Sequence, residues 1–208
     1  MNLHFITFEG GEGSGKTTLI KKLVTDLESK GYKILQTREP GGSKIAEDIR
    51  AVILNVNNTK MDYRTEALLY AASRRQHLKE VILPAIDKGY LVICDRYIDS
   101  SLAYQGYARG LGIDEVYNIN LYATAGLLPD LTILIDEDAT VGLKRISDNN
   151  RDQNRLDLEK IDFHNKVREG YLEVLKKFPD RIVKVNGDQT IDNVYKDVLN
   201  VVLQRLEG

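Results

Sequence analysis

An eight-residue run near the N-terminus combines glycines, a lysine and a threonine in an arrangement that can bind nucleotide phosphates. It reads Gly10-Gly11-Glu12-Gly13-Ser14-Gly15-Lys16-Thr17 and matches the phosphate-loop pattern G-x-x-x-x-G-K-[ST] in full. Such glycines let successive backbone N–H groups turn inward at the start of a helix and cradle an anion. The ammonium of Lys16 would then reach the β- and γ-phosphates, and the hydroxyl of Thr17 would bind Mg²⁺.

The alternative for this run is a glycine-rich turn between a strand and a helix, with an incidental lysine. Both flanks favour the nucleotide, because the strand-like residues 3–9 precede the run and the helical pattern 18–30 follows it. We therefore predict a site for a nucleoside triphosphate. Its residues are Gly10, Gly11, Glu12, Gly13, Ser14, Gly15, Lys16, Thr17 and Thr18.

Charged residues also end two later strand-like runs of the sequence. Asp95 closes one of them, where an aspartate can hold Mg²⁺, usually through a water, opposite Thr17; it could instead be a turn or cap residue. Arg38 and Arg96 each stand next to the predicted phosphate site. Either could form an ordinary ion pair with its acidic neighbour, but two converging guanidinium forks favour a second phosphorylated ligand.

Two helical segments carry side chains that could recognise a base. Tyr70 and Arg74 are four residues apart and share one helix face, so a ring could stack on a base while the guanidinium bonds its edge. An aromatic residue on an apolar helix face is more often part of the core, and the residues alone favour that interpretation for Tyr70. Ser101, Tyr104 and Gln105 lie on neighbouring turns, a pattern that an ordinary helix would also give.

The polar segment 147–155 carries Arg151 and Arg155, four residues apart. A solvated loop is the default explanation for such polarity. Phosphoryl transfer, however, needs positive charge at the γ-phosphate while it moves, together with exclusion of water, and an arginine-bearing lid supplies both. We favour a lid over residues 147–156.

Strand-like apolar runs alternate with helical patterns along the chain. The predicted strands are 3–9, 32–38, 90–95, 131–136 and 181–186. The predicted helices are 18–30, a segment capped by Ser43, 63–87 with a kink or interruption at Pro84, 98–107, 114–126, 139–149, 158–177 and 190–206. This alternation predicts one α/β domain over residues 1–208, a P-loop three-layer sandwich whose five-stranded parallel sheet collects ligands at the carboxyl ends of its strands.

Composition narrows the partners and the compartment. The 208 residues include 29 Lys plus Arg and 31 Asp plus Glu, so a net charge of -2 gives no overall field for nucleic acid or an acidic membrane. The single cysteine, Cys94, cannot form an intrachain disulfide and fits a reducing compartment. The sequence shows neither a signal peptide nor a long apolar run. We expect a cytoplasmic protein that binds neither membrane nor nucleic acid.

Four blocks together are specific enough to indicate a family. They are Phe8-Glu9-Gly10 with Glu12, Thr37-Arg38-Glu39-Pro40-Gly41-Gly42, Ala71-Ala72-Ser73-Arg74, and Asp95-Arg96-Tyr97-Ile98-Asp99-Ser100-Ser101-Leu102-Ala103-Tyr104-Gln105-Gly106. Over essentially the whole chain, the sequence resembles the bacterial thymidylate kinases. The resemblance implies transfer of the γ-phosphoryl group of ATP to thymidine monophosphate (dTMP), with Mg²⁺ as cofactor, and commonly a homodimer.

The resemblance also implies roles for individual residues. The dTMP site would comprise Arg38, Glu39, Arg50, Tyr70, Arg74, Arg96, Ser101, Tyr104 and Gln105. Arg38 and Arg96 would grip the phosphate, Tyr70 would stack on thymine, a position where phenylalanine is common, and Arg74 would bond the edge of the base. Ser101 and Gln105 would lie near the base, Tyr104 against the sugar and Glu12 near the 3′-hydroxyl.

The catalytic residues that the resemblance implies are Lys16, Arg96, Arg151, Arg155 and Glu12. Family members with an arginine in the phosphate loop use it on the γ-phosphate, but this loop has none. The chain therefore resembles the members whose lid supplies that charge, which indicates Arg151 and Arg155. The acceptor phosphate is largely dianionic at neutral pH and is already a nucleophile, so no general base is needed.

Two other functions remain open from the residues. One is a kinase of the same fold that acts on a nucleoside or on another monophosphate. The other is a nucleotide-dependent switch, against which stands the absence of an Asn-Lys-x-Asp guanine-reading motif, since Asn165-Lys166 is followed by Val167-Arg168.

Overall fold

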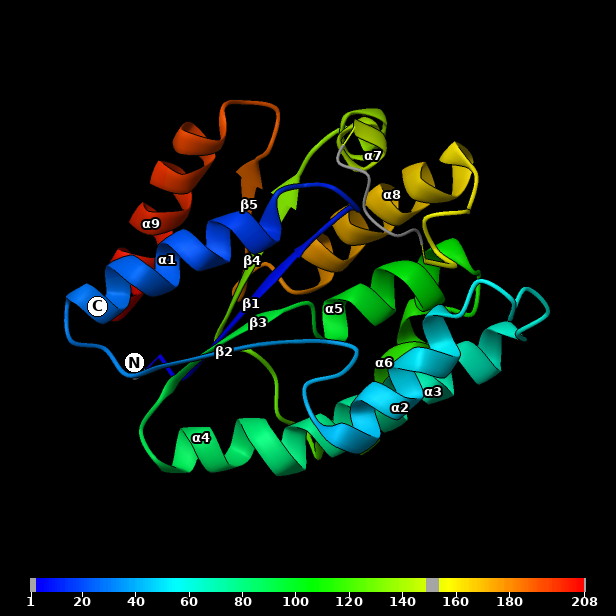
Figure 1. Cartoon of the computed structure of the whole chain (residues 1–208), viewed down its shortest axis with the longest axis horizontal. Helices are drawn as coiled ribbons and strands as arrows, with labels where there is room; N and C mark the ends of the chain where they lie inside the picture. The colour runs from blue at the N-terminus through cyan, green and yellow to red at the C-terminus, as the bar shows by residue number, and fades with distance from the viewer. Residues whose placement is uncertain (1–2, 149–153, 208) are drawn as a thin grey trace.

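The computed structural model describes residues 3–148 and 154–207, and its centre is a sheet whose paired strands all run parallel (Figure 1). The strands are β1 (Phe5–Gly10), β2 (Ile34–Arg38), β3 (Leu91–Asp95), β4 (Leu131–Asp136) and β5 (Ile182–Asn186). Their spatial order is β2-β3-β1-β4-β5. The predicted α/β fold with a five-stranded parallel sheet is confirmed, since each predicted strand overlaps an observed one.

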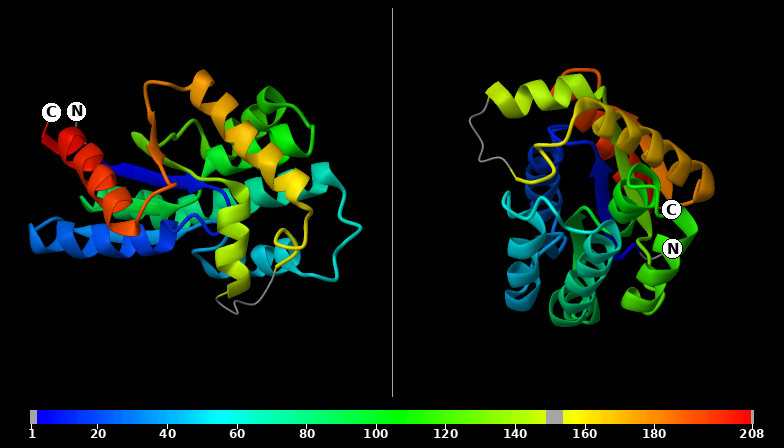
Figure 2. Two further views of the ribbon diagram at one scale, coloured as in Figure 1. Left: turned by 90° about the horizontal axis from the view of Figure 1, so that it is seen from above. Right: turned by 90° about the vertical axis from the view of Figure 1, so that its right-hand side faces the viewer.

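Helices cover both faces of this sheet. The α-helices are α1 (Lys16–Ser29), α2 (Lys44–Leu54), α3 (Tyr63–His77), α4 (Leu83–Asp87), α5 (Ile98–Ser101), α6 (Ile113–Thr124), α7 (Ala139–Asp148), α8 (Ile161–Lys177) and α9 (Ile191–Glu207). Two π-helical turns, η1 (Leu78–Ile82) and η2 (Leu102–Ala108), complete the described elements. Helices α1 and α9 lie side by side (Figure 2).

Two cores form because successive strand residues point to opposite faces of the sheet. On β1, Ile6 and Phe8 are buried against α1 and α9, whereas Phe5 belongs to the core beneath α8 and the two π-helical turns. Glu9, two residues beyond Thr7 on that second face, is fully buried. No helix among the described residues is both long and apolar enough to cross a lipid bilayer.

The two π-helical turns replace regular helix at places where the sequence predicts α-helix. In the segment 63–87, η1 precedes α4, whose first turn contains Pro84. Proline has no N–H to donate to the preceding turn, so a wider turn before it accommodates the missing bond. In the predicted helix 98–107, η2 follows one short turn of α-helix. Such π-turns occur frequently at functional sites, and η2 carries Tyr104 and Gln105.

The carboxyl ends of the three adjacent strands β2, β3 and β1 meet at one edge of the sheet. Arg38 pairs in register with Asp95, and Asp95 pairs with Phe8 just before the phosphate loop. The fold therefore brings residues from three distant parts of the sequence to one edge.

Candidate active site

The phosphate loop adopts a conformation that requires glycine. Gly10 and Gly13 have φ of 142° and 74°, which L-residues with side chains rarely adopt. A Cβ on Gly13 would lie 2.1 Å from the carbonyl oxygen of Gly142 in α7, and one on Gly10 would lie 2.5 Å from that of Ile135. The loop is thus packed against β4 and α7 by its backbone.

Lys16 lies across this loop and is almost fully buried. Its Nζ donates to the carbonyl oxygens of Gly11 at 2.8 Å and Gly10 at 3.1 Å, and to Ser14 Oγ at 3.1 Å. Burial lowers the pKa of its ammonium from 10.5 to about 8. The positive charge is therefore held at the loop by oxygen acceptors that a phosphate could replace.

A cavity of about 660 Å³ opens in front of the loop, within the usual size range of ligand sites. Predicted site residues that line it are Glu12, Gly13, Ser14, Gly15, Lys16, Thr17, Thr18, Arg38, Glu39, Arg50, Tyr70, Asp95, Arg96, Tyr104 and Gln105. Gly10 and Gly11 do not line it. The cavity continues past the loop to Gly187, Gln189, Ile191 and Val194, which the sequence analysis missed; their only sequence signal is their place after the last strand.

Thr17 and Asp95, the two predicted metal ligands, are in direct contact. Thr17 Oγ1 donates to Asp95 Oδ2 at 3.1 Å, and both side chains face the cavity. Within residues 3–148 and 154–207, no group of three or more His, Cys, Asp or Glu side chains could hold a metal ion by itself. A hydroxyl and a carboxylate beside a phosphate loop are the donor set that suits Mg²⁺, which keeps several waters and also binds substrate phosphates.

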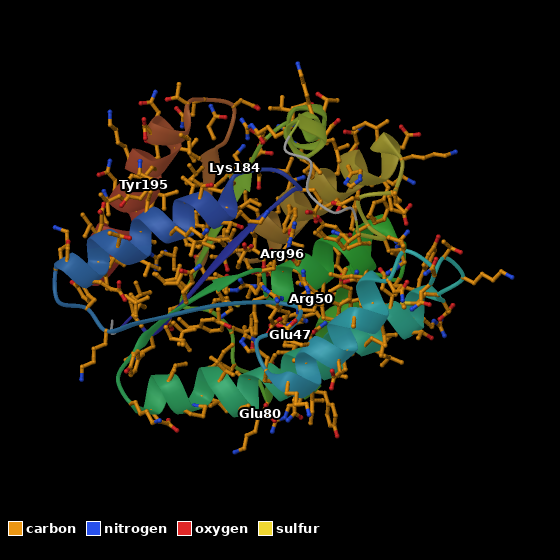
Figure 3. All side chains as sticks on the ribbon, in the orientation of Figure 1. Glu47, Arg50, Glu80, Arg96, Lys184 and Tyr195 are labelled. Atoms are coloured by element: carbon orange, nitrogen blue, oxygen red, sulfur yellow. The ribbon has the colours of Figure 1, made fainter. Side chains whose placement is uncertain are left out.

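Arg96 lines the same cavity as Arg50, and Figure 3 labels both toward the middle of the molecule. Its φ of 69° is in the left-handed region, an uncommon conformation for a residue with a side chain. Its Nη1 donates to the Gly10 carbonyl at 3.0 Å, and its Nη2 donates to Glu12 Oε1 at 2.8 Å. The same Glu12 oxygen accepts from Tyr104 OH at 3.1 Å. Glu12 thus links the loop to both Arg96 and η2.

Two guanidinium groups that line the cavity meet at one backbone carbonyl oxygen. Arg38 Nη1 and Arg50 Nη1 donate to the same Pro40 carbonyl oxygen, at 2.7 and 2.8 Å. Arg38 Nη2 also binds Glu47 at 2.9 Å. Burial, and then the charge of Arg38, lower the pKa of Arg50. Two cations this close would be stabilised by an anion in the cavity.

Arg74 and Ser101 are not among the cavity-lining residues. Arg74 is 2% exposed. Its Nε donates to Glu39 Oε2 at 2.7 Å, its Nη1 to Ser101 Oγ at 3.0 Å and to Asn120, and its Nη2 to the Tyr97 carbonyl at 2.9 Å. The guanidinium therefore braces the cavity wall from behind and holds Glu39, which does line the cavity.

Tyr70, Tyr104 and Gln105 form part of the remaining wall. Gln105 Nε2 donates to the buried carboxylate of Glu66 at 2.9 Å, which fixes its amide. The Cζ of Arg96 lies 5.2 Å from the centre of the Tyr104 ring, within cation–π range. Aromatic and amide side chains thus form this part of the cavity wall.

The predicted lid is described only in part. Arg151 lies outside the described residues. Arg155 is buried, and its Nη2 binds Glu66 Oε2 at 2.5 Å while its Nε donates to the Ile53 carbonyl at 2.9 Å. It does not line the cavity. In this conformation, Arg155 acts as a buried ion-pair partner and does not present its charge to the phosphate loop.

Arg145, which the sequence analysis missed, does line the cavity. Its Nη1 lies 2.7 Å from Glu137 Oε1 and 3.3 Å from the Gly13 carbonyl oxygen. Its helix contacts the loop at Gly142, where a Cβ would lie 2.1 Å from the Glu12 carbonyl oxygen. A glycine inside a predicted helix was the available signal, since it often marks a close backbone approach.

Comparison with known proteins agrees with this geometry. The family model for thymidylate kinase matches residues 8–198. The chain is 60% identical to the thymidylate kinase of Clostridium novyi, covering 93% of this chain and 95% of the relative, and 55% identical to that of Geobacillus thermodenitrificans, covering 100% and 93%. The crystal structure of thymidylate kinase from Ehrlichia chaffeensis superposes with a TM-score of 0.78 at 30% identity, covering 97% of this chain and 100% of that one.

Proposed function

The chain belongs to the thymidylate kinase family, and we propose that its cavity holds ATP and dTMP end to end along the carboxyl edge of the sheet. The reaction of this family is transfer of the γ-phosphoryl group of ATP to dTMP, a step in the synthesis of dTTP. One observation carries the residue-level proposal: a phosphate loop and the guanidinium groups of Arg38, Arg50 and Arg96 line one continuous cavity.

The triphosphate of ATP would occupy the phosphate loop. Its oxygens would accept hydrogen bonds from the backbone N–H groups at the start of α1, and Lys16 would exchange its loop carbonyls for the β- and γ-phosphates. We propose that Mg²⁺ accompanies ATP, with the Thr17 hydroxyl and the Asp95 carboxylate on its side of the cavity. Mg²⁺ held there would offset part of the negative charge of the triphosphate.

The phosphate of dTMP would lie among Arg38, Arg50 and Arg96. These three cations would offset the repulsion between two anionic substrates, and their planar forks would orient the acceptor oxygen toward the γ-phosphate. This arrangement needs no general base, because the acceptor phosphate is already ionised. The base would stack on Tyr70, with Gln105 at its edge, and Tyr104 would contact the sugar.

Arg74 and Ser101 would contribute to base recognition indirectly, because Arg74 binds Ser101 and holds Glu39 in the cavity wall. Glu12 would give up part of its contact with Arg96 in order to meet the 3′-hydroxyl. We propose that Arg151 or Arg155, in the segment 147–156, brings positive charge to the transferring phosphoryl group. Arg145 is a third candidate, because it already lines the cavity. We also propose that residues 1–208 form one domain.

We further propose a homodimer in the cytoplasm. Large apolar side chains are exposed on three helices that pack on one another, α2, α3 and α6: Ile45, Val52, Leu68 and Tyr122, the last with 92% of its surface exposed. A second copy of the chain would cover them. The free, buried thiol of Cys94 is consistent with a reducing compartment.

Release of ADP from ATP·Mg²⁺, measured by a coupled assay with each deoxynucleoside monophosphate and with thymidine, tests the proposal. We expect dTMP to accelerate ADP release far more than the other monophosphates, and thymidine to be inactive because it lacks the phosphate that the arginines bind. Phosphorylation of thymidine as fast as dTMP would instead identify a nucleoside kinase. ATP binding without consumption in the presence of any monophosphate would identify a switch.

A further inference from the structure

The carboxylate of Glu9 lies fully buried at the end of β1, outside the residues assigned above to either substrate. A buried carboxylate is costly unless it is hydrogen-bonded. Glu9 accepts three hydrogen bonds: from the Tyr97 backbone N–H at 2.7 Å, from Ser100 Oγ at 2.5 Å and from Tyr171 OH at 2.9 Å. The last donor comes from α8, 162 residues away in sequence. Glu9 therefore joins three separate elements.

The two hydroxyls that donate to Glu9 also accept from Arg96. Arg96 Nη1 lies 3.2 Å from Ser100 Oγ and 2.9 Å from Tyr171 OH. Each hydroxyl has one hydrogen, and when that hydrogen points to an ionised Glu9, the oxygen lone pairs remain free to accept from the guanidinium. The hydrogen bonds then run in one direction, from Arg96 through the hydroxyls to Glu9, and such chains strengthen one another.

Glu9 also fixes the backbone at Arg96. The left-handed φ of 69° at Arg96 is unfavourable for a residue with a side chain and persists only where neighbouring contacts hold it. The backbone N–H of Arg96 donates to the Phe8 carbonyl at 2.9 Å, and the next N–H, that of Tyr97, donates to Glu9. Both acceptors lie on β1. The strand thus sets the direction in which the Arg96 side chain leaves the backbone.

We propose that Glu9 is a positioning residue that aims the Arg96 guanidinium into the acceptor half of the cavity. This inference rests on the proposed function, in which Arg96 binds the dTMP phosphate. Glu9 touches neither substrate in this scheme and acts only through Arg96, Ser100 and Tyr171.

Protonation of Glu9 would remove part of the hydrogen bonding that supports Arg96. Burial, and then the charge of Asp99, raise its pKa from 4.5 to about 7, while Arg96 lowers it. The other titratable groups that interact with Glu9 are Lys16 of α1, Cys94 of β3, Tyr171 of α8 and Arg181 before β5. A protonated Glu9 has one oxygen that donates, so one of its three donors loses its acceptor and the support of Arg96 weakens.

Steady-state kinetics of Glu9→Gln at pH 8 test the proposal. Glutamine keeps the volume, but its amide NH₂ cannot accept from the hydroxyls. We expect KM for dTMP to rise about 10- to 100-fold, the usual effect of losing a group that orients a functional residue, with KM for ATP unchanged. Tyr171→Phe removes one of the relaying hydroxyls and should shift KM for dTMP in the same direction by a smaller factor.

Asp99→Asn is the matched control, because it removes a neighbouring buried carboxylate that binds Arg181 and Thr132, whereas the Arg96 guanidinium donates to other groups. We expect it to leave KM for dTMP at pH 8 unchanged.

The pH dependence of kcat/KM for dTMP gives a second readout. As pH falls, kcat/KM of the wild type should decline through about pH 7, where Glu9 is protonated, and again through about pH 6, where the dTMP phosphate is protonated. Glu9→Gln should keep only the lower decline, and Asp99→Asn should move the upper one to lower pH.

Two results would overturn the inference: a folded Glu9→Gln variant with wild-type KM for dTMP, or equal increases in KM for ATP and dTMP. If Glu9→Gln does not fold, Tyr171→Phe decides, since an unchanged KM for dTMP contradicts the relay and a raised one supports it. Arg96→Ala separates this inference from the proposed function. If Arg96→Ala leaves dTMP kinetics intact, the proposed role of Arg96 fails; if it weakens them while Glu9→Gln does not, only the positioning role fails.

Discussion

The Nη2 of Arg96 donates to Glu12 Oε1 across 2.8 Å, so the residue that follows β3 is tied directly to the phosphate loop. In the proposed binding mode, Arg96 would contact the dTMP phosphate, and Glu12 belongs to the loop that would hold the ATP phosphates. Since the two side chains share a contact, a ligand bound to one would change the partners available to the other.

Lys16→Ala should remove most turnover while leaving the protein folded. The ammonium binds loop oxygens, so its loss strands no buried carboxylate. Loss of one group that stabilises transferring charge typically lowers kcat about 10²- to 10³-fold. Turnover with saturating ATP and dTMP, together with a thermal melting curve, checks both halves of this statement. Near-normal kcat in the folded variant would contradict the role.

Arg74→Ala should act mainly on stability. It would leave the buried carboxylate of Glu39 without its guanidinium, and breaking such a buried pair typically costs about 3–5 kcal/mol. Arg38→Ala is the control, because its pair with Glu47 is about half exposed and should contribute no more than about 1 kcal/mol. Urea unfolding of both variants measures the difference. Equal losses would show that Arg74 is not the structural brace described above.

Arg145→Ala and Arg155→Ala should show opposite effects. Removing Arg155 strands part of the buried Glu66 carboxylate and should lower the free energy of unfolding, and kcat per folded enzyme should change little if Arg151 alone supplies the lid charge. Removing Arg145 takes a cation from the cavity and should lower kcat/KM for ATP with little loss of stability. If Arg155→Ala instead reduces kcat about 10²-fold or more in a folded protein, Arg155 is the lid cation that the family resemblance indicates.

The stability of the wild type should depend on pH through Glu9. Its pKa is raised from 4.5 to about 7 in the folded state, so the folded protein binds more protons than the unfolded chain between these values. The contribution of Glu9 is therefore fully present below pH 4.5 and is lost as pH rises through about 7, by up to ~3 kcal/mol. Urea unfolding of the wild type and Glu9→Gln at pH 5 and pH 8 measures it. An identical pH dependence in both proteins would contradict this assignment.

The order of elements and the phosphate loop could be predicted because they depend on local sequence. Apolar runs such as 131–136 indicate buried strands by themselves, and the spacing of glycines before Lys16 defines an anion site. The place of Asp95 beside the phosphate loop could be predicted because the ends of parallel strands meet at one edge of the sheet. The convergence of Thr17 and Asp95 follows from that rule.

Other parts of the site depend on packing between distant segments. The helix period puts Arg74 beside Tyr70, yet whether its guanidinium enters the cavity or braces the wall depends on Asn120 from α6. The pairing of Arg155 with Glu66 spans 89 residues and has no local signal. The π-turn η2 is a shift in backbone hydrogen bonding that apolar periodicity does not record.

The contact between Gly13 and Gly142 has a mechanical consequence. Each lacks a side chain at a point where the backbone of α7 touches the backbone of the phosphate loop, with no room for even one methyl group. A tilt of α7, the helix that leads into residues 149–153, therefore cannot be absorbed by rearranging side chains. Such a tilt would instead displace the peptide groups of the phosphate loop through steric contact, independently of charge or ionic strength.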